Sequence, residues 1–329
     1  MQRPHHLLLT PIAPRLPTWL SAPLALRLDT ALQHSIPELL DEERRTVAHV
    51  ADLLAAVATQ PDPLDLALLD QLVRRLQARL RALACQAHPE LRAVERLDRL
   101  LKSERAEIMD APWAPRWLHA AEMRWLEKLN LDLDNYARWR QLMLDAVQDV
   151  PDARIEDVAA GAAGFFIWLA QHAGRQDLQL TASDYSADYV AQGQRAVAQL
   201  SRDALPLAVV QRDATQLADL AGQVDLVVCT QATHHMSHAL VARLLHQSLL
   251  AASRGVLVID LLRSGGSLLA AALASNLSTP APPLMLDAMQ SVRRGFLPAE
   301  LALLAHLAGA QFVRAEAFDP AYVVLRAWR

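Results

Sequence analysis

The stretch Arg154-Ile-Glu-Asp-Val-Ala-Ala-Gly-Ala-Ala-Gly-Phe-Phe166 decides the fold of this chain. Its first residues predict a short strand, its run of small residues predicts a tight turn, and the aromatic pair predicts the start of a helix. A second apolar run, Leu178-Gln-Leu-Thr-Ala-Ser-Asp184, ends on a carboxylate. This order is typical of a nucleotide-binding half-fold, because the turn lets backbone approach the ligand and the carboxylate accepts hydrogen bonds from ribose.

The chain after residue 150 repeats this pattern. Short apolar or β-branched runs alternate with helical segments, which predicts a doubly wound, mainly parallel α/β sheet. The seven runs are 155–158, 178–182, 207–210, 224–229, 255–260, 311–317 and 322–328. Only Phe318-Asp-Pro-Ala321 separates the last two runs, which is too short for a parallel crossover. We therefore expect an antiparallel hairpin at the edge of the sheet.

The first half of the chain has helical periodicity instead. Apolar residues three and four apart between Leu69 and Leu83 predict an amphipathic helix, and further helices are expected around 114–130 and 134–148. Pro89 opens another predicted helix, whose buried face is expected to carry Leu91, Val94, Leu97 and Leu101. The chain then divides into a helical N-terminal extension (1–104), a helical lid segment (105–150) and a Rossmann-like domain (151–329).

Composition limits the partners. The 32 basic and 36 acidic residues give a formal net charge of −4, which argues against nucleic acid and anionic membranes as partners. No apolar run reaches the roughly 20 residues of a membrane span. Cys85 and Cys229 are too few and too far apart for a disulfide framework, which fits a cytoplasmic protein. A homodimer formed through the N-terminal helices is expected.

The order of motifs after residue 150 resembles that of class I S-adenosylmethionine-dependent methyltransferases. Asp157-Val-Ala-Ala-Gly-Ala-Ala-Gly164 stands where this family has its glycine-rich first motif. Gln211-Arg-Asp-Ala-Thr215 is similar to the pair that contacts adenine, and Val224-Asp-Leu-Val-Val-Cys-Thr230 is similar to the strand beside the methionine part of the cofactor. The resemblance implies S-adenosyl-L-methionine as cofactor, bound by Asp157, Ala159, Gly161, Gly164, Asp184, Tyr185, Asp213, Ala214 and Thr230.

The first motif departs from the family at two positions. Ala159 and Ala163 stand where glycine is usual, and alanine disfavours the positive φ that glycine adopts freely. Gly164 supplies some of that freedom one residue later. The departure leaves open a catalytically silent homologue that acts as a binding or scaffolding module. A nicotinamide-dependent oxidoreductase is a third possibility, although the terminal hairpin argues against it.

Segments outside these motifs are similar to a subset of bacterial methyltransferases often encoded near polyketide or quinone-type biosynthesis. These segments are Glu107-Ile-Met-Asp110, Asp260-Leu-Leu-Arg-Ser264 and Ser291-Val-Arg-Arg-Gly-Phe-Leu-Pro-Ala-Glu-Leu301. The resemblance implies a small, fairly apolar acceptor and the O-methylation of a phenolic or polyketide-type metabolite.

Two pairs of residues are candidates for the acceptor side. His234 and His235 follow the fourth predicted strand, and an imidazole pKa near 6.5 suits removal of a phenolic proton. Arg263 and Arg293 could bind a carboxylate or phenolate, although surface ion pairs are the ordinary fate of arginine. The spacing His234-His-x-x-His238 lacks the glutamate of the zinc-protease motif, so no metal is expected.

Overall fold

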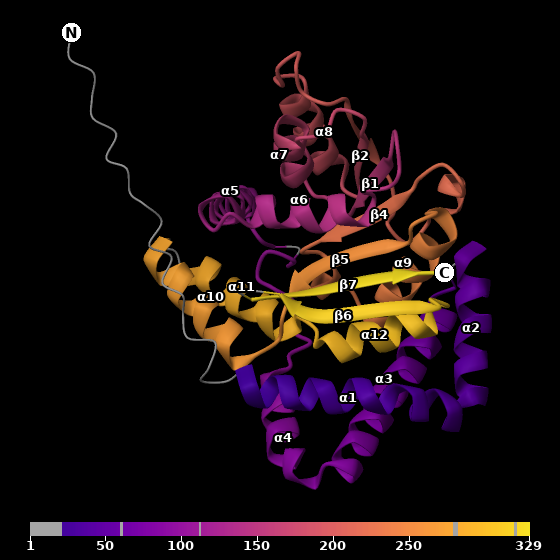
Figure 1. The fold of residues 1–329 in the computed structure, drawn as a ribbon. Coiled ribbons are helices and arrows are strands. Elements are labelled where there is room, and N and C mark those ends of the chain that lie inside the picture. Colours follow the sequence, from indigo (N-terminus) through magenta and orange to yellow (C-terminus); the bar gives the residue numbers. More distant parts are fainter. Residues whose placement is uncertain (1–21, 60–61, 112, 279–281, 319–320) are drawn as a thin grey trace.

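A seven-stranded sheet forms the centre of the protein (Figure 1). The structure is a computed structural model, and it describes residues 22–59, 62–111, 113–278, 282–318 and 321–329. Residues 1–21 of the predicted N-terminal extension lie outside the described residues. The strand order is β3-β2-β1-β4-β5-β7-β6. The strands are β1 (Arg154–Val158), β2 (Gln179–Asp184), β3 (Leu207–Gln211), β4 (Leu226–Thr230), β5 (Val256–Leu261), β6 (Phe312–Phe318) and β7 (Tyr322–Trp328).

The sheet confirms the predicted fold class. Strands β1 to β5 pair in parallel, and β7 pairs antiparallel with both β5 and β6. In the antiparallel register Ile259 faces Val324 across β5 and β7. The predicted hairpin is therefore present, with β6 at the edge and β7 between β5 and β6.

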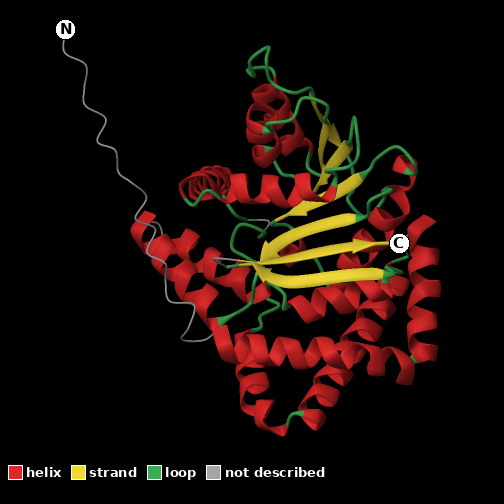
Figure 2. Ribbon diagram, in the orientation of Figure 1, coloured by secondary structure: helices red, strands yellow, loops and turns green. Residues whose placement is uncertain are grey.

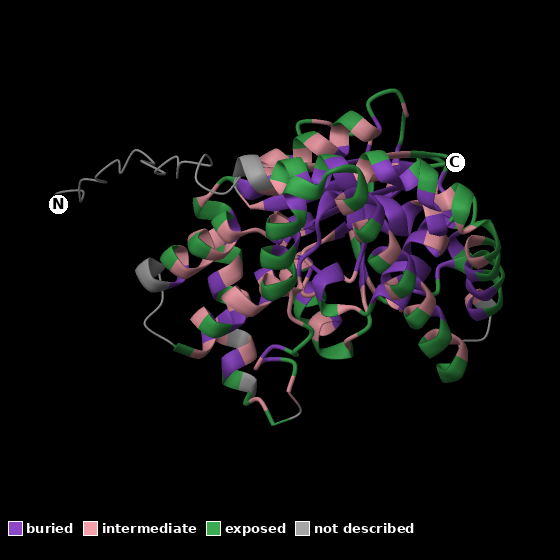
Figure 3. Cartoon of the chain, turned by 90° about the horizontal axis from the view of Figure 1, so that it is seen from below, coloured by how far each residue is buried: buried purple, intermediate pink, exposed green. Residues whose placement is uncertain are grey.

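Alternate side chains of the strands enter two different cores. On β4, Leu226 and Val228 pack in the core that includes helices α6 (Asn135–Ala146) and α7 (Gly164–His172). Val227 and Cys229 point to the opposite face, into the core that includes α9 (His238–Ala251) and α12 (Pro298–Leu307). Figure 3 shows these strands buried between helices whose outer faces are exposed. Burial on both faces explains why the central strands β4 and β5 are nearly continuous apolar runs.

The N-terminal helices extend one of these cores. They are α1 (Ala22–Glu42), α2 (Arg44–Thr59), α3 (Pro63–Ala87) and α4 (Arg92–Leu101). Leu28, Leu54 and Leu76 of α1, α2 and α3 belong to the same apolar cluster as α9 and α12. These helices therefore lie against the α12 side of the sheet (Figure 2). The predicted boundary at 104/105 falls between α4 and α5, and the division of the chain into three parts stays a prediction.

Other helices cover the opposite face and the end of the sheet. Helices α5 (Arg116–Asp132) and α6 confirm the helices expected around 114–130 and 134–148, and α8 (Ala187–Val197) lies beside α7. Helices α10 (Gly265–Ser278) and α11 (Pro282–Arg294) project past the end of β5 (Figure 1). None of the helices in the described ranges has the length and apolar character needed to cross a membrane.

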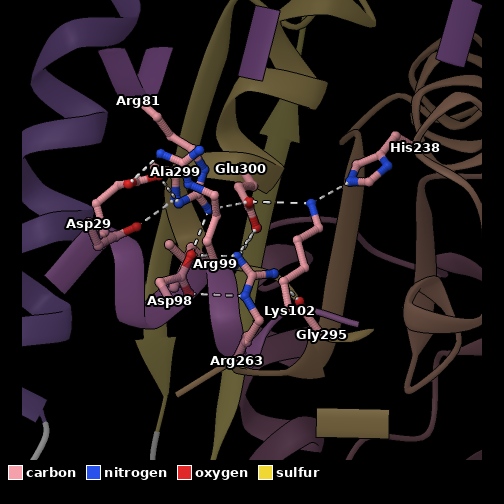
Figure 4. A network of polar contacts seen from close by, with 12 residues as sticks. Asp29, Arg81, Asp98, Arg99, Lys102, His238, Arg263, Gly295, Ala299 and Glu300 are labelled. Atoms are coloured by element: carbon pink, nitrogen blue, oxygen red, sulfur yellow. Dashed lines mark hydrogen bonds and ion pairs between the residues drawn. The ribbon is translucent and has the colours of Figure 1, made fainter. Parts of the chain in front are cut away.

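The predicted buried face of α4 is wrong in part. Leu91 is buried as expected, but Leu97 is 61% exposed, and the buried side chains of α4 are Glu95 and Asp98. The helix is rotated because Arg81 of α3 and Arg263 after β5 bind these carboxylates inside the protein (Figure 4). A charge–charge partner distant in sequence has replaced the apolar contact that the local periodicity predicted.

Candidate active site

The turn after β1 adopts the backbone of a glycine-rich loop. Ala159, Gly161 and Ala163 have φ values of 53°, 55° and 64°. These left-handed conformations cost an alanine about 1–2 kcal/mol each, so the turn forms with glycine at only one of the three positions. A Cβ on Gly161 would lie 3.5 Å from Met123 Cε, so α5 closes over this turn.

Asp184 at the end of β2 fixes the turn from the neighbouring strand. One of its carboxylate oxygens accepts a hydrogen bond from the backbone N–H of Gly161 at 2.8 Å, and the other accepts from Ser186 at 2.8 Å. Burial raises the pKa of Asp184 and outweighs these hydrogen bonds, which lower it. The predicted ribose-binding residue and the predicted small-residue turn are therefore connected by a hydrogen bond.

A cavity of about 430 Å³ opens at the carboxyl ends of β1 to β4, where parallel sheets bind their ligands. It contains five of the predicted cofactor residues, namely Ala159, Asp184, Tyr185, Asp213 and Ala214. Thr215, Gln216, Met236, Leu240 and Arg243 complete one side, and Leu66 of α3 contributes from the N-terminal region. The volume is within the ordinary range for a small-molecule cofactor.

Three hydrogen bonds hold the carboxylate of Asp213 in a fixed position in the cavity wall. Its carboxylate accepts hydrogen bonds from the Thr215 N–H and hydroxyl and from Gln216, each at 2.8 Å. Burial raises its pKa, but these hydrogen bonds outweigh burial, so the pKa lies below its ordinary value. A fixed, ionised acceptor beside an apolar surface suits the amino edge of an adenine. The residues present thus fit a nucleoside such as that of S-adenosylmethionine.

The other predicted cofactor residues do not line this cavity. Asp157 is 1% exposed, and its Oδ1 accepts no hydrogen bond from the part of the chain that the structure describes. Burial, followed by the charges of Glu156 and Asp184, raises its pKa well above the ordinary value. Gly164 begins α7, and Thr230 ends β4. These residues shape the strand ends that hold the turn.

His234 forms a buried imidazole–carboxylate pair at the carboxyl ends of β4 and β5. Its Nδ1 lies 2.6 Å from Oδ1 of Asp260, the penultimate residue of β5, and both side chains are buried. Asp260 also accepts hydrogen bonds from the hydroxyl of Thr233 and the N–H of His234. Burial raises the pKa of Asp260, but the charge and hydrogen bond of His234 outweigh it, so the pKa lies below its ordinary value.

Carboxylates from the lid segment surround the two histidines. Glu107 Oε1 lies 3.8 Å from His234 Nε2 and 3.9 Å from His235 Nδ1, and Asp110 Oδ2 lies 3.3 Å from His235 Nδ1. The imidazole rings of His234 and His235 are 4.2 Å apart. The predicted pair of histidines is thus one cluster with Glu107 and Asp110, which the sequence places more than 120 residues away.

Helices α5 and α11 complete this cluster. Asp287 of α11 accepts hydrogen bonds from the N–H groups of Ile108 (2.7 Å) and Met109 (3.0 Å), which holds the lid segment in place. Glu122 of α5 is 2% exposed, and burial followed by the charges of Asp287, Glu107 and Asp110 raises its pKa to about 8. The cluster around the two histidines is therefore rich in carboxyl groups.

The predicted acceptor-side arginines have other partners. Arg263 is 1% exposed and binds Asp98, Glu300 and the carbonyl of Gly295 (Figure 4). Arg293 donates a hydrogen bond from Nε to the carbonyl of Leu101. This placement does not fit a role in acceptor binding, because both guanidinium groups tie the helices together.

Arg294 faces the cluster instead. Its Nε donates a hydrogen bond to the carbonyl of His234 at 2.7 Å, and its Nη1 lies 3.4 Å from Asp110 Oδ2. The sequence offered no signal to choose it, because Arg293 and Arg294 are neighbours and the phase of α11 decides which one faces inward.

The sheet order, the loop after β1 and the acidic strand ends are those of the class I methyltransferase fold, so this part of the chain is an S-adenosylmethionine-dependent methyltransferase domain. Residues 155–252 match the model of a family described as a methyltransferase domain. The predicted cofactor is the one that this class uses, and the oxidoreductase alternative does not fit.

Solved structures are similar to this chain at low sequence identity. The structure of the plantazolicin methyltransferase BpumL with S-adenosylhomocysteine (SAH) is 12% identical, has a TM-score of 0.50, and covers 72% of this chain and 100% of its own. A SAM-dependent methyltransferase from Aquifex aeolicus is 16% identical, with a TM-score of 0.41, and covers 57% of this chain and 88% of its own. No curated protein sequence matches the chain.

Proposed function

We propose that this protein transfers the methyl group of S-adenosylmethionine to a hydroxyl oxygen of a small phenolic or polyketide-type acceptor. The observation that carries the proposal is the buried pair of His234 and Asp260, since His234 stands two residues before Met236 of the cavity wall. The bound cofactor supplies an electrophilic methyl group on a positively charged sulfur. A phenol with a pKa near 10 must lose its proton to attack this group efficiently, whereas a neutral amine needs no such help.

The geometry supports a role for His234 in this proton loss. The carboxylate of Asp260 holds a proton on Nδ1 of His234, which leaves Nε2 as the nitrogen directed toward Glu107 and the cluster. His235, the second candidate, is half-buried and lies beside Asp110. Helix α5 lies over the turn through Met123, which favours exclusion of water from the reacting groups.

The acidic cluster narrows the class of acceptor. An acceptor that is apolar over its whole surface would leave Glu107 and Glu122 desolvated without partners. We therefore propose an acceptor with polar groups next to the methylated oxygen and with its apolar part directed away from these carboxylates. Pairing of two chains through the N-terminal helices and a cytoplasmic location stay predictions.

A methylation screen tests the proposal. Release of SAH is measured with three acceptors that share one aromatic core and carry a hydroxyl, an amino or a thiol group. We expect turnover with the hydroxyl compound, and about a 10²- to 10⁴-fold lower rate for His234→Asn with SAH affinity unchanged. Turnover of the amine alone, or an unchanged rate in His234→Asn, would refute the assignment.

The cofactor is tested separately. Asp184→Ala removes the acceptor of the Gly161 and Ser186 hydrogen bonds and of the proposed ribose contacts. We expect calorimetric titration with SAH to show binding in the natural chain and at least about a tenfold loss in this variant, which corresponds to about 1.4 kcal/mol. Equal affinity in both proteins would place the nucleoside elsewhere.

A further inference from the structure

We infer that Glu107, His234 and His235 form a binding site for a divalent transition-metal ion such as Zn²⁺. One ligand atom from each of the three side chains lies within 4.8 Å of the others. Two imidazoles and a carboxylate are a ligand set that Zn²⁺ uses in sites with an open fourth position. The sequence did not suggest this site, because its spacing lacks the glutamate of the zinc-protease motif, and Glu107 supplies the carboxylate from a distant segment.

The distances are close to those of a metal site. Glu107 Oε1 lies 3.8 Å from His234 Nε2 and 3.9 Å from His235 Nδ1. In a tetrahedral zinc site with bonds of about 2.0–2.1 Å, neighbouring ligand atoms are about 3.4 Å apart. Small rotations of the side chains would therefore bring all three atoms to bonding distance.

The carboxylate of Glu107 points to a ligand independently of the cluster. Glu107 is 3% exposed, and its Oε1 accepts no hydrogen bond from any residue in the described ranges. A buried oxygen without a partner costs about 1–3 kcal/mol, more when it is charged. A cation between Oε1 and the imidazole nitrogens would remove this cost.

His234 also has the outer partner that metal-binding histidines have. Its Nδ1 lies 2.6 Å from Asp260 Oδ1, which fixes the tautomer in which Nε2 carries a lone pair. Asp260 is held in turn by Thr233 and by the backbone N–H of Leu261. Imidazole orientation by a buried carboxylate is the arrangement that makes a histidine a strong ligand.

The local charge is complementary to a divalent ion. Glu107, Asp110 and Asp287 lie around the histidines, and Arg294 is the cation that contacts Asp110 among the described residues. A bound divalent cation would neutralise a site that is otherwise short of positive charge.

The inferred ion deepens the proposed function and rests on it for the chemistry. The acceptor hydroxyl would occupy the open position on the ion, which lowers its pKa. The O–H bond of the acceptor hydroxyl would break, and its proton would pass to the carboxylate of Asp110. The O–CH₃ bond then forms as the S–CH₃ bond breaks, with the electron pair left on sulfur. No group changes oxidation state, and His234 acts as a ligand instead of as the proton acceptor.

Metal titration without any acceptor tests the site. Protein treated with a chelator and dialysed is titrated with Zn²⁺ in a calorimeter and with Co²⁺ in a spectrophotometer. We expect one equivalent of Zn²⁺ with a dissociation constant of about 1 µM or tighter, and visible Co²⁺ bands typical of a site with few ligands. Glu107→Gln and His235→Ala should each weaken Zn²⁺ binding at least about 100-fold, and Asp260→Asn about 10- to 100-fold.

The matched control is His88→Ala. His88 Nδ1 lies 3.4 Å from Glu90 in a surface pair, so this variant also removes a histidine beside a carboxylate. It should bind Zn²⁺ like the natural chain, and SAH affinity shows that each variant is folded. Absence of Zn²⁺ binding, or equal loss in all variants, overturns the inference. Hydroxyl methylation without metal binding would refute the metal site alone, and metal binding without hydroxyl methylation would refute the proposed function alone.

Discussion

Arg263→Met should strongly destabilise the protein because Arg263 neutralises carboxylates that water does not reach. Its guanidinium donates to Asp98 at 3.0 and 3.2 Å and to Glu300 at 2.8 Å, and Glu300 is 2% exposed (Figure 4). Removing one partner of a buried ion pair costs about 3–5 kcal/mol. Arg81 still contacts Asp98 and Glu300 at 2.6 and 2.9 Å, so we expect the lower end, about 3 kcal/mol.

The assay is urea unfolding followed by tryptophan fluorescence. With a slope of about 3 kcal/mol per molar urea, a loss of about 3 kcal/mol lowers the midpoint by about 1 M. Arg99→Met is the control, because Arg99 also binds a carboxylate of α4 at 2.7 Å but its side chain is 68% exposed. Exposed pairs contribute about 0–1 kcal/mol, so this variant should change the midpoint little.

A second substitution separates lost charge from lost packing. In the Arg263→Met background, Glu300→Gln removes one of the two buried carboxylates that then share Arg81, and it should restore part of the lost stability. A loss below about 1 kcal/mol in Arg263→Met would show that the network contributes little, and this would refute the reasoning. A further loss of several kcal/mol in the double variant would show that the bonds of Glu300 to Arg81 and to the Leu297 N–H outweigh the relief of buried charge.

Three more outcomes are expected. Ala163→Gly should stabilise the protein by about 0.5–1 kcal/mol in thermal unfolding and keep SAH binding, because relief of the left-handed strain exceeds the entropy that glycine adds to the unfolded chain. Burial above all raises the pKa of Asp29 from 3.8 to about 6, so ionisation disfavours the folded state. Relative to Asp29→Asn, the natural chain should lose up to about 3 kcal/mol of unfolding free energy as pH rises from about 4 to 6, with no further loss above pH 6. Urea unfolding of both proteins at several pH values measures this difference, and a difference that does not change between pH 4 and 6 would contradict the prediction. Leu66→Ala should weaken SAH binding about fivefold in calorimetry, whereas Leu68→Ala on the same helix, outside the cavity, should not.

The sequence alone determined the class of fold and identified most residues of the cavity that is proposed to hold the cofactor. Apolar runs of strand length, helices between them and a short final connection are local features, and each strand lies within two residues of its predicted position. Asp184 and Asp213 were found because parallel strands bring their carboxyl ends to one edge, whatever the packing of the rest. Ala159 and Ala163 of the first motif adopt the left-handed backbone conformation that glycine favours, so the motif could be recognised despite the two alanines.

The tertiary structure decided the acceptor side and the role of the N-terminal helices. Glu107 and His234 meet across more than 120 residues, and Asp98 and Arg263 across 165, so no local pattern relates them. The periodicity of α4 predicted Leu97 inside, but two buried arginines made Glu95 and Asp98 the buried residues. Periodicity depends on neighbours three and four residues apart, whereas charge pairing and cavity walls depend on which distant helices pack together, and that is determined only when the whole chain folds.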